Sequence, residues 1–72
     1  MFVRYQIGKN VDAGVVSFTI TVLDGTVPIE VFIHQDVPVG WQIIERVIPE
    51  VQLQLVTNWD DIRVRVEVDV VP

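Results

Sequence analysis

The sequence predicts a mainly β fold, a small five-stranded antiparallel barrel or curled sheet with one short helix between the third and fourth strands. Three observations support this prediction. Five segments alternate apolar with polar residues, which is typical of strands with one buried face. Clusters of Gly, Pro, Asn and Asp separate these segments, as turns do. Only one segment places apolar residues at helical spacing. With 72 residues, the chain forms a single domain, residues 1–72.

The first half of the chain contains three predicted strands. Residues 2–7 are rich in β-branched and aromatic side chains, and a glycine-containing loop follows at residues 8–14. Residues 15–23 and 27–34 both alternate, and Gly25 lies between them in a sequence typical of a tight hairpin turn. The order therefore begins with strand, strand, strand.

The alternation in residues 27–34 divides that strand into two faces. Ile29, Val31 and Ile33 share the apolar face and are assigned to the core. Phe32 and His34 share the opposite face, where Phe32 either packs under the helix or a neighbouring subunit or lies outward with His34.

The predicted helix covers residues 40–48. Trp41, Ile44 and Ile48 fall on one helical stripe, which assigns Trp41 to the core rather than to a contact. Pro49 ends the element because the residue before a proline avoids helical angles. The β-branched residues weaken the helix, so it needs packing to be stable.

Two further strands are predicted after the helix, at residues 50–57 and 62–70, with a turn at residues 58–61. The order β-β-β-α-β-β resembles that of the OB-fold, in topology only. A small barrel accommodates five such strands and their edges. The alternative is an open α+β sheet with the helix on one face. The predicted core comprises Val16, Phe18, Ile20, Val22, Ile29, Val31, Ile33, Ile44, Ile48, Leu53, Leu55, Val64, Val66 and Val68.

Composition restricts the function. Half of the residues are apolar, which is a large share for so short a chain and favours an apolar surface shared with a partner or a second copy. The net charge of −5 opposes binding to nucleic acid or to anionic membranes. The start of the chain lacks the apolar run of a signal peptide, and no apolar run reaches membrane-spanning length, so we expect an intracellular location or a place within a virion.

Catalytic and metal-binding chemistry is not predicted. There is no cysteine, and His34 and Ser17 are the only residues of their kinds. Ser17 lies within a regular strand where nothing activates it as a nucleophile. Asp60 and Asp61 are adjacent, so their side chains are expected to point apart rather than share a cation. We therefore predict no enzyme activity, no cofactor and no metal site.

Aromatic residues provide the first part of a candidate interface. Phe32 and His34, if they face outward, would form a platform on which a base could stack, as in single-strand-binding proteins. Trp59 lies in the turn before the last strand, where an indole is exposed and can anchor a protein contact.

The last strand provides the second part. Its polar face carries Arg63 and Arg65, then Glu67 and Asp69. Two copies placed antiparallel would set the cations of one against the anions of the other, as a two-fold interface requires. On a solitary edge strand the same charges would discourage random pairing.

The favoured function is a non-catalytic structural or protein-interaction module that acts as a homo-oligomer or within a larger assembly. Small viral or phage structural or accessory proteins fit this description. Three alternatives are an OB-like domain that binds single-stranded nucleic acid, an acidic inhibitor that mimics nucleic acid, and a designed β protein. The regular binary pattern favours the last of these, whereas the glycine and prolines around the helix oppose it.

Overall fold

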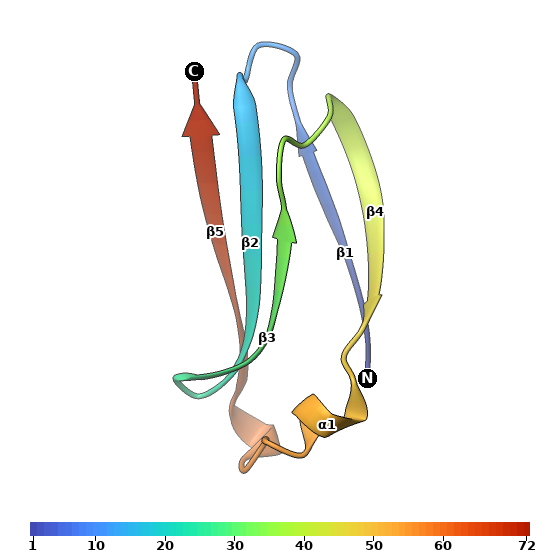
Figure 1. Cartoon of the computed structure of the whole chain (residues 1–72), viewed down its shortest axis with the longest axis vertical. Helices are drawn as coiled ribbons and strands as arrows, with labels where there is room; N and C mark the ends of the chain where they lie inside the picture. Colours follow the sequence, from blue (N-terminus) through green and yellow to red (C-terminus); the bar gives the residue numbers. More distant parts are fainter.

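The computed structural model describes all residues 1–72 and contains two antiparallel sheets that face each other (Figure 1). The two-stranded sheet pairs β1 (Phe2–Lys9) with β4 (Gly40–Val47). The three-stranded sheet has the order β3-β2-β5, formed by Val27–His34, Val15–Asp24 and Ile62–Val71. The molecule is elongated, with principal extents of 42 × 21 × 17 Å.

Short helical segments lie at one end of this sandwich. The helix α1 (Glu50–Leu53) and a 3-10 turn (Trp59–Asp61) carry the chain from β4 in one sheet to β5 in the other (Figure 1). With four residues, α1 is far too short to span a membrane, and the structure has no other α-helix.

The prediction of a mainly β fold with five antiparallel strands is confirmed, but the closed barrel is wrong. Neither the OB-like order nor the open sheet covered by a helix describes the two sheets. The largest error is at residues 40–48, where the structure has β4 in place of the predicted helix. Each residue of β4 pairs with β1, from Phe2 opposite Val47 to Lys9 opposite Gly40. This pairing overrides a weak helical stripe of β-branched residues.

The opposite error occurs just after Pro49. Residues 50–57, predicted as a strand, form α1 and the loop that follows it. Pro49 stands at the helix start, and its carbonyl oxygen accepts hydrogen bonds from the amides of Gln52 and Leu53. Gln and Leu are good helix formers, which permits the single turn.

The core lies between the two sheets, with β2 at its centre. Ile20 of β2 packs against Ile7 of β1 and Val37, and the chain between β3 and β4 places Val37 between the sheets at 2% exposure. Of the predicted core, Val16, Ile20, Val22, Ile29 and Ile48 are buried. Val31, Ile33, Leu55, Val64, Val66 and Val68 are exposed, so their assignment to a closed core is wrong.

A bulge in β3 explains part of this error. Val22 pairs with Glu30, whereas the next residue, Leu23, pairs with Pro28, so Ile29 is an extra residue in β3. An extra residue inverts the alternation beyond it. After the bulge, Phe32 therefore points inward and Ile33 lies on the outer face.

One carboxylate fixes the loop that leads into β5. Asp24, at the end of β2, accepts hydrogen bonds from the amide and hydroxyl of Thr57 at 2.8 and 2.9 Å and from the amide of Asn58 at 3.3 Å. These bonds favour the ionised form and hold the pKa of Asp24 below its ordinary value, and the bond from the Thr57 amide has the largest effect. The carboxylate thus fixes the chain just before β5 begins.

Candidate interaction surface

The last strand, β5, is incompletely covered. It pairs with β2 over its whole length, from Val71 opposite Val15 to Ile62 opposite Asp24. Four side chains, which we call the valine face of β5, point toward the space between the sheets because they pair with inward residues of β2: Val64, Val66, Val68 and Val70. Their exposed fractions are nevertheless 62%, 57%, 56% and 51%. The covering sheet has one strand fewer, so β5 has no layer above it.

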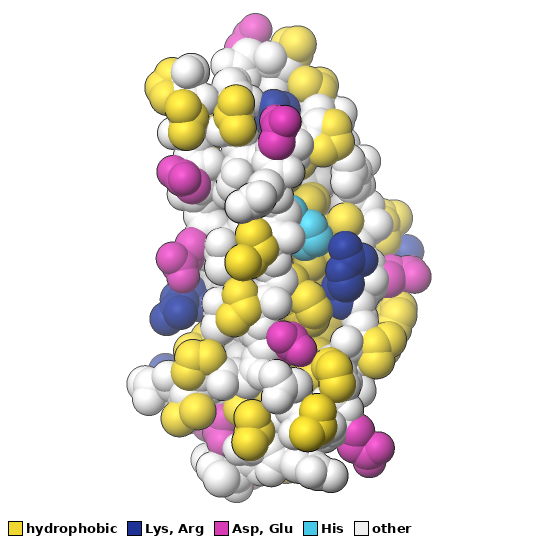
Figure 2. All heavy atoms as spheres, viewed as in Figure 1, with side chains coloured by type: hydrophobic (Ala, Val, Ile, Leu, Met, Phe, Trp, Pro, Cys, Tyr) yellow, Lys and Arg dark blue, Asp and Glu magenta, His cyan; other side chains and the backbone are white.

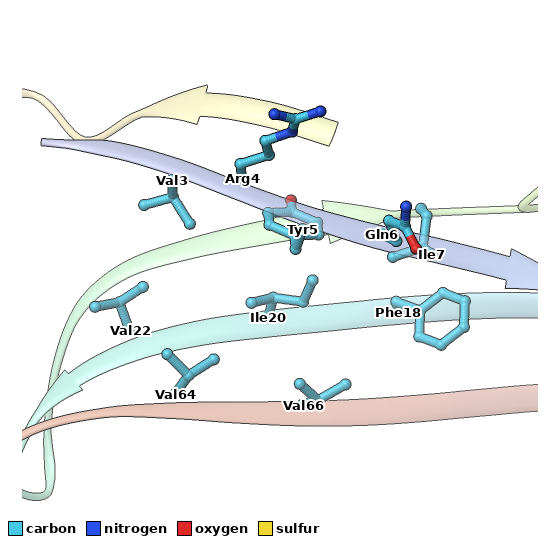
Figure 3. A pocket seen from close by; sticks show the side chains of 10 residues that line it. All are labelled: Val3, Arg4, Tyr5, Gln6, Ile7, Phe18, Ile20, Val22, Val64 and Val66. Carbon is cyan, nitrogen blue, oxygen red and sulfur yellow. The ribbon is translucent and has the colours of Figure 1, made fainter. Parts of the chain in front are cut away.

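The uncovered strip forms a groove beside β1 with a volume of about 240 Å³, which we call the β5 groove (Figure 3). Its floor includes Ile20, Val64 and Val66, and Val3 and Tyr5 of β1 form its wall. Most of the lining is apolar, so the groove offers a partner hydrophobic contact rather than directed hydrogen bonds.

The other side of β5 is the charged face, formed by Arg63, Arg65, Glu67 and Asp69. Arg65 Nε lies 3.1 Å from Glu67 Oε1, and Arg63 Nε lies 2.9 Å from Asp61 Oδ1. Both ion pairs are mostly exposed and join residues two positions apart, so each adds little to stability. The charges therefore remain available to a partner.

The two edges of the three-stranded sheet differ. The edge at β3 contains Pro28, which lacks an amide hydrogen, and the bulge at Ile29. Both features blunt an edge against pairing with another chain. The edge at β5 has ten residues with no proline, glycine or shift of register. It is the open edge of this sheet.

The structure does not place Phe32 and His34 on an outer platform. Both face the interior. Phe32 packs against the core cluster of Ile7, Ile20 and Val37, and Tyr5 lies against the rings of Phe32 and His34. The Tyr5 hydroxyl and His34 Nε2 are 2.5 Å apart, and the phenol donates when Nε2 carries no proton. The histidine is visible in a hollow of the molecule's surface, with apolar side chains and a basic side chain beside it (Figure 2). The predicted stacking site is therefore wrong.

Burial controls the ionisation of this pair. Loss of water lowers the pKa of His34 below its ordinary value of 6.5, and the nearby Arg46 guanidinium lowers it further. Burial raises the pKa of Tyr5, with Arg46 acting in the opposite direction. Near neutral pH the imidazole and the phenol are thus both uncharged.

The depressed pKa of His34 predicts a loss of stability in mild acid. The unfolded chain takes up the proton first, so the stability linked to neutral His34 is complete above 6.5 and is lost as the pH falls through the folded-state pKa. We expect the melting temperature to fall between about pH 7 and pH 5. Since His34 is the only histidine, His34→Gln should flatten this slope. Circular-dichroism melts would measure it, and an equal slope in both proteins would contradict the assignment.

The two tryptophans are both exposed. Trp59, at 54%, lies beside the start of β5, in agreement with its predicted exposure. Trp41 was placed in the core through the helical stripe, and this is wrong because it is 79% exposed on the outer face of β4. Phe2, Ile43 and Val47 are exposed on the same face. The period-two spacing of Trp41, Ile43 and Val47 was the available signal for this second apolar face.

No protein-family model, no curated protein and no solved structure matches this chain. The candidate surface is therefore judged on its own geometry. It combines an open ten-residue edge, an uncovered valine face and a charged face with both signs.

Proposed function

We propose that the protein is a non-catalytic structural or protein-interaction module that works as a subunit of an assembly, with β5 as its contact element. The observation that carries the proposal is the valine face, which points inward and yet remains more than half exposed. Full burial of one valine stabilises by about 1.5 kcal/mol or more. A small domain has only about 5 kcal/mol in total, so covering this face would add substantially to stability.

The rest of the surface supports the same role. Only 10 of the 72 residues are buried, although half of the chain is apolar. Apolar side chains are consequently spread over the surface (Figure 2). Small viral and phage structural or accessory proteins are one class that works through such contacts, and the proposal includes that class.

The alternatives have less support. A nucleic-acid-binding role depended on outward Phe32 and His34, which face the interior, and ten acidic residues outnumber five basic ones. A mimic of nucleic acid needs a dense acidic surface, whereas the charged face of β5 carries equal numbers of both signs.

The proposal is tested by the dependence of unfolding on concentration. Association stabilises the folded state by mass action, so we expect the melting temperature of the complete chain to rise over an about hundredfold range of concentration. Val66→Lys, on the valine face, should abolish the rise. Val31→Lys, at an exposed valine on the outer face of β3, should retain it. A constant melting temperature, together with a monomeric mass by light scattering, would contradict the proposal.

A further inference from the structure

We infer that the partner of β5 is a second copy of the same chain, paired antiparallel and edge to edge about a two-fold axis through Val66. This inference rests on the proposed function and specifies its partner. The two three-stranded sheets would then form one sheet with the order β3-β2-β5-β5-β2-β3. The sheet edge at β5 is the open one, and its unpaired amides and carbonyls would gain partners.

The charges identify the second copy as the occupant. An axis through Val66 sets Arg65 opposite Glu67 of the second copy, and Arg63 opposite its Asp69. The two-fold symmetry repeats both pairs, which gives four cross-strand contacts between opposite charges. Directly opposite side chains in an antiparallel pair lie close enough to interact.

Neighbouring registers lack this complementarity. An axis through Arg65 sets that arginine against its own copy, and an axis through Glu67 does the same for two glutamates. An axis through Val64 places Arg63 opposite Arg65, and one through Val68 places Glu67 opposite Asp69. Like charges directly opposite are unfavourable, so the charges select the register centred on Val66.

The same register matches the valine face. Opposite residues of an antiparallel pair lie on one side of the sheet, so Val66 meets Val66 and Val64 meets Val68. These β-branched pairs pack side by side and cover part of the surface left exposed in the single chain. One alignment thus satisfies both faces of the strand.

Charge reversal tests the partner. Arg63→Glu plus Arg65→Glu makes all four opposing pairs of a homodimer acidic, and Glu67→Arg plus Asp69→Arg makes all four basic. We expect each variant alone to self-associate at least about tenfold more weakly than wild type in light scattering or sedimentation. An equal mixture should form a mixed dimer, because all four pairs then have opposite signs. The variant with all four substitutions should dimerise alone.

Matched controls separate local charge from total charge. The combination of Asn10→Asp, Val39→Glu, Val51→Glu and Gln54→Glu lowers the net charge by the same four units at exposed positions outside β5 and its groove, and should leave association unchanged. The variant with all four substitutions on β5 keeps the wild-type net charge.

Cross-linking tests the register. The chain has no cysteine, so Val66→Cys introduces one thiol, which would face its own copy across the axis. Paired Cα atoms about 4.5–5.5 Å apart are within reach of a disulfide. Residue 64 is on the same face and similarly exposed, but it lies opposite residue 68 of the second copy, four residues from the other residue 64. Val64→Cys should therefore not cross-link with itself. A mixture of Val64→Cys and Val68→Cys should form the mixed disulfide.

The outcomes distinguish the inference from the proposed function. A chain whose association is lost in Val66→Lys but is unaffected by the charge reversals, or that cross-links equally at positions 64 and 66, uses β5 in another register. Either result overturns the inference and leaves the proposed function standing. A wild-type chain that stays monomeric overturns both.

Discussion

Ile20→Ala is expected to leave the protein largely unfolded near room temperature. Ile20 is 5% exposed on the central strand β2 and packs against Ile7 and Val37 between the sheets. Truncation of a buried isoleucine costs about 2–5 kcal/mol. A chain of this size buries a smaller fraction of its surface than a larger domain does and has about 5 kcal/mol of stability, so the loss removes most of it. Far-UV circular dichroism and urea unfolding would measure the effect.

The matched control is Ile33→Ala, which removes the same atoms from a side chain that is 62% exposed on the outer face of β3. We expect a shift of at most about 0.5 kcal/mol, as for other surface substitutions. Similar losses in the two variants would contradict the inward turn of Phe32 and the bulge at Ile29 that produces it.

Gly8→Ala is expected to be the second severe change, with a cost of about 1–3 kcal/mol through overpacking. In the β1–β4 pair, Gly8 lies opposite Trp41. An added Cβ at Gly8 would overlap the carbonyl oxygen of Gly40 and lie 2.8 Å from the Trp41 ring. The backbone oxygen cannot rotate away, so the two strands must separate.

Two measurements isolate this effect. Gln6→Ala changes an exposed residue on the same outer face of β1 and should alter stability by less than about 0.5 kcal/mol. In a Trp59→Phe background, the emission of Trp41 alone reports on its surroundings and should shift in Gly8→Ala. An unchanged melting temperature and spectrum would show that the indole does not lie over Gly8.

The hairpin of β2 and β3 was the part of the fold most accessible to sequence analysis. Strict alternation and Gly25 defined the two strands, and both are present. The phase of β3 was not accessible, because a single extra residue at Ile29 exchanges its faces without altering its composition. Whether a bulge forms depends on the pairing partner rather than on local residues.

The error at β4 has a similar cause. Its apolar residues fit both a helical stripe and an alternating strand, and pairing with β1 decides between them. Pairing between strands that are distant in the sequence cannot be inferred from a short stretch of residues.

The candidate surface was predictable in part. The alternation of residues 62–70 correctly separated the valine face from the charged face, and the charges were assigned to the surface. The exposure of the valines was not foreseen, because a pattern shows which side chains share a face and not what covers them. The prediction that Phe32 and His34 form an outer platform was wrong because the bulge exchanges the two faces of β3.

The proline and the bulge in β3 have a consequence for how far such a sheet can grow. A sheet that can pair at one border, β5, and cannot pair at the other, β3, has a valence of one along the hydrogen-bonding direction. Two copies joined at β5 would present only the borders containing Pro28, so growth terminates and fibrous polymers are avoided. In such a dimer, Pro28 would act as a chain terminator encoded within each subunit.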